Sequence, residues 1–402
     1  MKNNIIETCT EAHECLACNS KSLRIVLDLG SQPLANSYLR RPEDLEDSFP
    51  LTLNACIDCR HMQLGHIINP DMLFKNYLYV SGTTKTLRDY FKWLAQLVRQ
   101  YLPKAETVLE VACNDGTQLD EFSNIGMKTF GIDPATNLHV ESSKRHRIIC
   151  GYLNSVSIAA LKQDNYDVIV AQNVLAHTGK PLQFLKDIRN AMHDETLLFV
   201  QTSQSDMVSM GQFDTTYHEH ASFFCINSMI KLIHRANMSI VKILKTEIHG
   251  GSTVFVISKN KGLMLSSDAY SDHLEFTARS SCGLDVFSER SKEIINILSD
   301  KIKKAKSNGY LVAGYGAAAK GNTVLNFGNI KLDFIVDDNQ LKQGMFTPGM
   351  RIPILSPETA LQQAAQKITW IILSWNFSKE IEERIKSTFT GCDNVFIKIG
   401  FE

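Results

Sequence analysis

The chain has 402 residues, of which 44% are hydrophobic and 21% are charged, a composition typical of globular proteins. At about 150 residues per domain, this length is too great for a single core and predicts two or three domains. The 42 Lys and Arg residues nearly balance the 43 Asp and Glu residues, which excludes a general electrostatic attraction to nucleic acid or to an anionic membrane.

The sequence also lacks the patterns of membrane insertion and secretion. No segment reaches the ~20 uninterrupted apolar residues of a membrane span, and the first residues lack the apolar stretch of a secretory signal. We therefore expect a cytoplasmic protein, and leave open whether it is a monomer or a dimer. Ten cysteines are too few for a disulfide scaffold, and in a reducing compartment clustered cysteines more often bind metal.

The first 75 residues, expected to form a lobe of their own, contain two Cys-x2-Cys pairs and short strand-like runs at 23–29 and 51–54. Four thiolates at this spacing can complete a tetrahedral zinc shell, and the metal would replace the core that so irregular a segment lacks. A closed shell leaves no position for a catalytic water, so we expect a structural Zn²⁺; four unliganded core thiols are the alternative. The expected ligands are Cys15, Cys18, Cys56 and Cys59.

The rest of the chain alternates helical and strand-like patterns. Apolar residues at helical spacing predict a helix over 86–101, within a domain expected to span 76–262. Strand-like runs follow at 107–111, 129–132, 166–170, 196–201 and 252–257, which indicate a doubly wound α/β sheet. A helix-favouring stretch over 264–307 leads to runs at 310–314, 332–336 and 368–373, which predict the parallel strands of a second α/β domain over 263–402.

The first strand of the central domain ends in a turn whose polar groups suit a nucleoside. Glu110, Asn114, Asp115 and Gly116 lie where strand gives way to helix, and Asp133 ends the next strand. Ligands of open α/β sheets bind at the carboxyl ends of the strands, where such an acid can hold both ribose hydroxyls. Because the glycine-rich dinucleotide fingerprint is absent, an adenosine without phosphates, as in S-adenosylmethionine (SAM), fits better than NAD. The alternative is a structural sheet without a nucleotide.

A second strand-to-helix turn, Val312–Ala319, contains glycines and is followed by Asp337 after the next strand-like run. This pattern resembles a dinucleotide fingerprint, so an NAD-dependent nucleotide-sugar oxidoreductase is an alternative function. A further alternative is a zinc-ribbon nucleic-acid-binding module fused to a degenerate methyltransferase. The scarcity of Lys and Arg between Cys59 and Tyr77 argues against that module.

Eight segments, in chain order, resemble the SAM-dependent sugar C-methyltransferases of deoxysugar biosynthesis. Besides the cysteine pairs with Leu29–Asn36, they are Tyr77–Gly82, Glu110–Gly116, Ala171–His177, Tyr217–His220, His249–Ser252, Gly314–Gly321 and Val336–Asn339. The resemblance implies a zinc-binding lobe, a class I SAM methyltransferase domain and a C-terminal Rossmann-like domain that helps to hold a nucleotide-linked keto-deoxysugar, with TDP as the expected nucleotide. The chain departs from the family at Ala112-Cys113, where a glycine is usual, and at Val254, where an arginine is frequent.

The resemblance also assigns ligand-binding roles. It implies that SAM is bound by Glu110, Asn114, Asp115, Gly116, Asp133, Gln172, Asn173 and His177. For His177 a buried structural histidine is the alternative. It implies that the substrate is bound by Gly314, Gly316, Lys320, Asn322, His249 and Ser252. For the glycine turn and Lys320 the expected partner is the diphosphate, because the N-terminus of a helix favours anions. A second structural Rossmann-like fold with an empty crevice is the alternative.

Tyr217–His220 concentrates side chains that exchange protons, and with the resemblance it is the expected catalytic segment. A neutral histidine, with an ordinary pKa near ~6.5, can remove the proton next to a ketone. We expect His220 to be this base, Glu219 to orient it, and Tyr217 with Tyr77 or Tyr79 to donate to the oxyanion, at about 3 kcal/mol per donor. Spacing does not decide between His218 and His220, and a polar loop that only caps backbone groups is the alternative.

Overall fold

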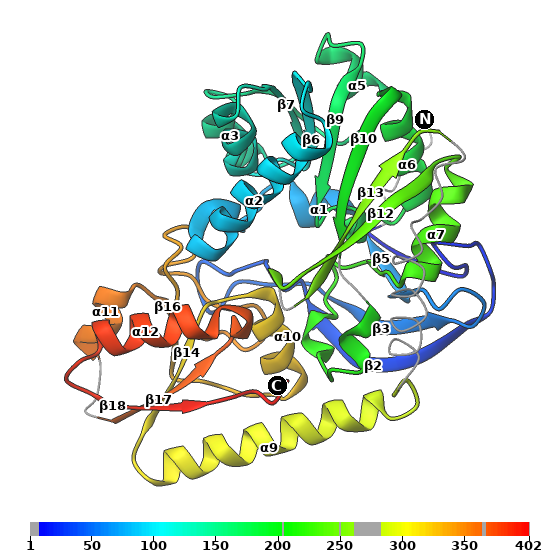
Figure 1. The fold of residues 1–402 in the computed structure, drawn as a ribbon. Helices are drawn as coiled ribbons and strands as arrows, with labels where there is room; N and C mark the ends of the chain where they lie inside the picture. The colour runs from blue at the N-terminus through cyan, green and yellow to red at the C-terminus, as the bar shows by residue number, and fades with distance from the viewer. Residues whose placement is uncertain (1–7, 203–204, 249–250, 261–282, 364–366, 402) are drawn as a thin grey trace, which may run out of the picture. The chain divides into compact units, whose positions relative to one another are not determined.

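The computed structural model describes residues 8–202, 205–248, 251–260, 283–363 and 367–401 (Figure 1). The described residues form two compact units. The first draws on Met1–Arg24, Asn54–Asp206 and Glu219–Ser281, and the second on Ile25–Leu53, Met207–His218 and Cys282–Glu402. These units are each built from several chain segments and do not correspond to the expected domains. The expected boundaries after residues 75 and 262 therefore stay predictions.

A seven-stranded sheet forms the centre of the first unit, in the order β12-β13-β10-β9-β6-β7-β8 (Figure 1). Its strands are β6 (Thr107–Val111), β7 (Lys128–Asp133), β8 (Arg147–Cys150), β9 (Tyr166–Gln172), β10 (Met192–Thr202), β12 (Ser239–Thr246) and β13 (Ser252–Ser258). The strands from β10 to β8 pair in parallel, whereas β13 runs antiparallel to both of its neighbours. The doubly wound α/β sheet predicted from the sequence is therefore confirmed.

The central strands are apolar on both faces because helices cover the sheet from both sides. Val108, Val168 and Val170 are fully buried in the middle of the sheet. The sequence did not predict β8 or β12. Strand β8 has only four residues, and β12 is a largely half-exposed edge strand whose two lysines mask its apolar pattern.

Helices connect the strands of the first unit, most of them short. They are α1 (Pro70–Phe74), η1 (Ser81–Thr83), α2 (Lys85–Tyr101), α3 (Thr117–Asn124), α4 (Thr136–Ser142), α5 (Ser155–Ala160), η2 (Leu175–His177), α6 (Pro181–Asn190) and α7 (Ile226–Arg235). Helix α2 confirms the predicted helix: the side chain of Thr84 caps it by accepting from the Leu87 N–H group. Its apolar stripe includes the fully buried Leu94 and Val98, each contributing about 1.5–3 kcal/mol.

The cysteine-bearing segments of the first unit have little regular structure. Strand β1 (Cys9–Glu11) pairs with β5 (His66–Ile68), and β4 (Met62–Leu64) pairs with β11 (Ser222–Phe223). Strands this short bury few side chains, which leaves the lobe dependent on another source of stability. The predicted strand-like runs lie within β2 (Leu23–Pro33) and β3 (Ser48–Cys56), which continue into the second unit.

The second unit contains a five-stranded parallel sheet in the order β16-β15-β14-β17-β18. Its strands are β14 (Leu311–Tyr315), β15 (Phe334–Val336), β16 (Ile354–Leu355), β17 (Lys367–Ile372) and β18 (Asp393–Ile397). Its helices are η4 (Phe213–Thr215), α9 (Phe287–Ser307), α10 (Ala319–Phe327), α11 (Pro357–Gln363), η6 (Trp375–Phe377) and α12 (Ser378–Thr388). The second α/β domain is thus confirmed. Within the helix-favouring stretch over 264–307, residues 283–286 form a turn and 287–307 form α9, while 264–282 lie outside the described residues.

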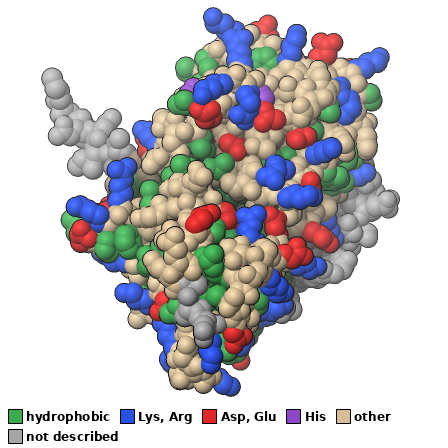
Figure 2. All heavy atoms as spheres, turned by 90° about the vertical axis from the view of Figure 1, so that its left-hand side faces the viewer, with side chains coloured by type: hydrophobic (Ala, Val, Ile, Leu, Met, Phe, Trp, Pro, Cys, Tyr) green, Lys and Arg blue, Asp and Glu red, His purple; other side chains and the backbone are tan. Residues whose placement is uncertain are grey.

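The described part of the chain contains no helix with the length and apolar character needed to cross a membrane. Figure 2 shows acidic and basic side chains interspersed over the face that it draws. Among the described residues on that face, no continuous basic stripe is visible, which agrees with the balanced charge of the sequence.

Candidate active site

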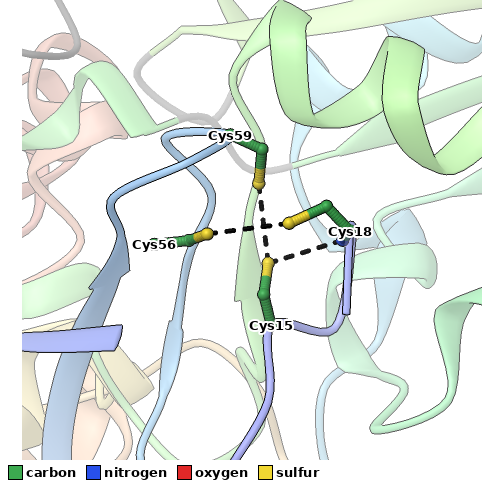
Figure 3. Close-up of side chains that lie close together, drawn as sticks. All are labelled: Cys15, Cys18, Cys56 and Cys59. Atoms are coloured by element: carbon green, nitrogen blue, oxygen red, sulfur yellow. Dashed lines mark hydrogen bonds between the residues drawn. The ribbon is translucent and has the colours of Figure 1, made fainter. Parts of the chain in front are cut away.

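The four predicted zinc ligands come together in the first unit (Figure 3). Their sulfur atoms all lie within 4.8 Å of one another, with Cys15 Sγ 3.5 Å from Cys59 Sγ and Cys18 Sγ 3.7 Å from Cys56 Sγ. Sulfurs that share one tetrahedral Zn²⁺ at ~2.3 Å are about 3.8 Å apart, so the thiols fit this ion. The hydrogen bond that the Cys15 and Cys59 sulfurs share lowers the pKa of Cys15 and raises the pKa of Cys59, so the first thiolate of the group forms at Cys15.

Each cysteine pair is followed by a turn of the same kind. Asn19 and Arg60 follow the pairs with φ angles of 70° and 65°, and their N–H groups donate to the carbonyls of Cys15 and Cys56. The neighbouring His61 is fully buried, with Nε2 3.2 Å from a serine hydroxyl, and burial lowers its pKa to about 3. This imidazole stays neutral and lies outside the metal-binding group.

The turn between β6 and α3 has the backbone shape of a ligand-binding turn without the usual glycines. Ala112, Asn114 and Gly116 have φ angles of 60°, 50° and 82°. The Ala112 N–H group donates to the carbonyl of Ile132 at 2.7 Å, which fixes the turn against β7. Asparagine and glycine adopt this left-handed conformation readily, whereas alanine does so at a cost.

Two carboxyl groups lie at the carboxyl ends of the central strands. Asp133 accepts from the Asn114 N–H group and from the Ala135 N–H group, at 2.8 Å each. Glu110 is buried, and its Oε2 atom has no hydrogen-bond partner among the described residues. Burial, followed by repulsion from Asp115 and Asp133, raises the pKa of Glu110 well above its ordinary value. A buried orphan oxygen beside an oriented carboxylate fits a ligand with hydroxyl and ammonium donors.

The side chains of Asn114 and Asp115 support a neighbouring loop. Asn114 accepts from the Ser81 N–H group and donates to the Tyr79 carbonyl. Asp115 accepts from the N–H groups of Gly82 and Thr117 and from the Thr117 hydroxyl. These contacts join the loop with the predicted catalytic tyrosines to the turn of the predicted cofactor site.

A cavity of about 1260 Å³ extends along this end of the sheet. Of the predicted SAM-binding residues, it is lined by Glu110, Asn114, Asp115, Asp133, Gln172, Asn173 and His177. Tyr77 and Tyr79 line it as well, so predicted cofactor and catalytic residues share one space. Gly151, Tyr152 and Leu153 also line it; sequence analysis missed them because they follow the unpredicted strand β8.

Two amides at the end of β9 are held by neighbouring side chains. The buried Tyr90 hydroxyl donates to Gln172 Oε1 at 2.9 Å. Asn173, with φ at 53°, donates to Gln201 Oε1 at 3.3 Å, and Gln201 donates in turn to the Ser252 hydroxyl at 2.9 Å. Ser252 therefore supports Asn173 through Gln201, and its expected substrate contact stays a prediction.

Several aromatic rings surround the predicted base. The imidazoles of His177 and His220 have centroids 5.1 Å apart, and the Phe74 ring stacks on His177 at 5.5 Å with an interplanar angle of 9°. Burial lowers the pKa of His177 to about 4, so this ring is neutral near pH 7. The Tyr77 hydroxyl donates to Glu219 Oε2 at 3.0 Å. His220, Glu219 and Tyr77 all belong to the first unit.

Tyr217 and His218, the first half of the His-rich segment, belong to the second unit. His218 Nε2 lies 3.3 Å from the Phe49 carbonyl, and the two rings meet edge to face. Residues 217–219 form a bend and turn instead of an extended strand. The choice of His220 over His218 as the base stays a prediction, and Tyr217 is half-buried.

The glycine turn of the second unit is shaped by packing. A side-chain carbon on Gly314 would lie 2.9 Å from Ile335 and from Leu373, and one on Gly316 would lie 2.3 Å from the Ser374 hydroxyl. Asp337 accepts from the N–H groups of Ala317 and Asn339. Helix α10 begins directly after this turn, and the N–H groups of its first turn have no acceptor within the helix.

The remaining predicted substrate residues have mixed surroundings. Asn322 is buried and donates to the Ala35 carbonyl at 3.0 Å. Lys320 is half-buried, with Nζ 4.7 Å from the centroid of the Trp375 ring. His249 lies outside the described residues. The buried Asp214, which sequence analysis missed, accepts from the Trp375 indole N–H at 2.6 Å.

Family comparisons cover nearly the whole chain. Residues 15–74 match a zinc binding domain, 83–243 match a methyltransferase domain, and 247–398 match the C-methyltransferase C-terminal domain. The glycine turn lies in the last of these segments, which weighs against its interpretation as an NAD site.

Two characterised proteins are similar in sequence. The C-methyltransferase NovU of Streptomyces niveus is 29% identical over 400 residues, which is 93% of this chain and 92% of that protein. The ubiquinone biosynthesis O-methyltransferase of Rhodopseudomonas palustris is 28% identical over 101 residues, or 24% of this chain and 39% of the relative.

Solved structures match parts of the chain. The plantazolicin methyltransferase BpumL in complex with SAH is 15% identical with a TM-score of 0.36, covering 42% of this chain and 82% of that one. The magnesium protoporphyrin IX methyltransferase of Synechocystis PCC 6803 is 11% identical with a TM-score of 0.37, covering 46% and 91%.

Proposed function

Because the chain belongs to the SAM-dependent C-methyltransferases with a zinc-binding domain, a methyltransferase domain and a C-methyltransferase C-terminal domain, we propose that its substrate is a nucleotide-linked keto-deoxysugar, TDP-linked in the first instance. The predicted enzyme class, class I methyltransferase fold, SAM and structural zinc are confirmed at this level. The methyl acceptor would be a ring carbon next to the ketone.

The cavity of the first unit is the observation that carries this proposal. It joins the carboxyl ends of β6 and β7 to Tyr77, Tyr79 and His177 in one space. Asp133 would accept from the ribose hydroxyls, while the orphan oxygen of Glu110 would accept from the ammonium of the methionine part. The bound cofactor supplies an electrophilic methyl group on a sulfonium.

His220 would act as the general base. Its imidazole removes the proton from the carbon next to the ketone, and the electrons of that C–H bond form the enolate whose carbon becomes the nucleophile. His177, kept neutral by burial at 5.1 Å from His220, adds no positive charge that would oppose the charge gained by the base.

Tyr77 would stabilise the enolate oxygen, with Tyr79 beside it at a ring distance of 6.2 Å. The Tyr77 hydroxyl donates to Glu219 in this structure, so it would exchange Glu219 for the substrate oxygen when the ketone binds. A donor aimed at a developing oxyanion can contribute about 3 kcal/mol to the rate. Tyr217 is proposed as a further donor, and Lys320 with the first turn of α10 as the diphosphate contact.

The proposal is tested by a turnover screen with SAM and a panel of TDP-, GDP- and CDP-linked keto-sugars, followed by mass spectrometry. The expected product gains one methyl group on carbon; methylation on oxygen, or no consumption of SAM with any panel member, would refute the proposal. His220→Ala should also stop exchange of the substrate α-proton with solvent deuterium, whereas His218→Ala should retain it. Normal exchange in the His220 variant would remove it from the role of base.

A further inference from the structure

The most deeply buried acid of the second unit has no part in the mechanism above. Asp214 lies in η4 with no exposed surface, and Oδ2 accepts from the Trp375 indole N–H at 2.6 Å. Its Oδ1 atom has no hydrogen-bond partner among the described residues. A buried carboxylate with one unsatisfied oxygen is costly unless a positive charge compensates it.

Lys320 provides this charge. Its ammonium lies 4.7 Å from the centroid of the Trp375 ring, and the charge of Asp214 raises the pKa of Lys320 against the larger lowering by burial. Trp375 therefore touches both groups, with its ring facing the cation and its N–H bonded to the anion. The three side chains form a cluster, which we call the Asp214 cluster.

The Asp214 cluster lies at the ligand-binding edge of the second sheet. Lys320 is in the first turn of α10, which follows β14, and Trp375 follows β17. These strands pair in parallel, with Tyr315 opposite Ile372 at their carboxyl ends. Open α/β sheets bind their ligands at this edge, so η4 is fixed where a nucleotide would bind.

Apolar and backbone contacts hold the same segment in place. The Phe213 ring lies 5.5 Å from that of Phe327 and 5.6 Å from that of Phe401. The Thr323 hydroxyl, on α10, is 3.5 Å from the Thr216 carbonyl. Residues 213–216, which lead directly into the predicted catalytic Tyr217, are thus attached to the C-terminal fold.

We propose that Asp214 is a positioning residue, which through Trp375 and Lys320 couples the placement of Tyr217 to occupancy of the nucleotide-binding edge of the second unit. The role of Tyr217 in this inference rests on the proposed function. The attachment itself, and its response to a nucleoside diphosphate, can be measured without turnover.

The test uses amide hydrogen exchange of the full chain, with two variants that remove different parts of the cluster. Asp214→Asn keeps an oxygen that can accept from Trp375 but removes the charge, and Trp375→Phe keeps a ring near Lys320 but removes the N–H donor. Exchange in residues 207–218 should accelerate about tenfold in both. The affinity for S-adenosylhomocysteine, bound by the first unit, should not change.

Trp370→Phe is the matched control, because it also removes an indole N–H donor from the same unit, in this case one bonded to Asn394 Oδ1 at 2.8 Å. It should leave exchange in residues 207–218 unchanged. An acceleration in this segment as large as in Trp375→Phe, or none in either cluster variant, would overturn the inference. Failure of TDP, GDP and CDP alike to slow exchange of this segment in the unmodified protein would overturn it as well.

With a substrate in hand, both cluster variants should lower kcat about tenfold or more while the KM for SAM stays constant. A KM for SAM that rises by the same factor as kcat falls would overturn the positioning role. If no keto-sugar of the panel is methylated, the proposed function fails while the exchange experiment still decides whether the cluster holds the segment.

Discussion

The backbone at Ala112 has a conformation that favours glycine, and we predict that Ala112→Gly stabilises the first unit. Its φ of 60° lies in the left-handed region, where a side chain costs about 1–2 kcal/mol. Glycine removes this cost but makes the unfolded chain more flexible, which opposes folding by about 0.4–1 kcal/mol. The methyl group is only half-buried, so its loss adds little. The net gain in the free energy of unfolding is roughly 0.5–1 kcal/mol.

Ala95→Gly provides the matched control, because Ala95 is buried in the middle of α2. There the same substitution should destabilise by about 2 kcal/mol, from helix propensity and the lost methyl group. Urea unfolding followed by circular dichroism, with calorimetric binding of S-adenosylhomocysteine, measures both variants. A fall in the unfolding midpoint of Ala112→Gly would refute the argument from φ, and unchanged or tighter binding would show that the turn keeps its shape.

Three further predictions concern the metal, the cofactor site and pH. Cys56→Ser should abolish zinc retention in metal analysis and lower the melting temperature, whereas Cys392→Ser, outside the cluster, should do neither. Tyr90→Phe removes the donor to the Gln172 amide and should raise the KM for SAM about threefold to tenfold with little change in kcat; an unchanged KM would contradict this. Burial lowers the pKa of His177 from 6.5 to about 4, so its contribution to stability is present above pH 6.5, declines as the pH falls to 4 and is lost below that. The His177→Gln variant should therefore show a flatter dependence of the unfolding free energy on pH between 6.5 and 4. A curve parallel to that of the unmodified protein would contradict the assignment.

Much of the fold could be predicted because its patterns are local. The stripe of α2 and the apolar runs of β6 and β9 follow from spacing within a few residues, and β14 and β17 follow in the same way. The cysteine pairs were equally informative, because their spacing alone determines that four sulfurs can meet. In contrast, β12 is an edge strand and β8 is short, so neither has enough buried residues to stand out.

The candidate site was predictable in its residue types but less so in their surroundings. Nothing near Asp214 in the sequence indicates that its partner is Trp375, 161 residues later. The surroundings of His218 likewise include Phe49, whose carbonyl and ring both contact it. Phe49 lies far from the His-rich segment in the sequence, so this contact could not be predicted from neighbouring residues. Such contacts are set by the packing of whole elements, and they decide which of several similar polar residues face a ligand.

The acids that end the second strand of each Rossmann-like fold have a matching construction. Asp133 and Asp337 each accept two backbone N–H groups, one from the turn after the first strand and one two residues beyond the acid itself. A search that treats an acid at this position as a hallmark of ribose recognition would count two nucleoside sites in this chain. Each acid therefore holds its turn through the same two backbone contacts, a structural role that is separate from any contact with a ribose.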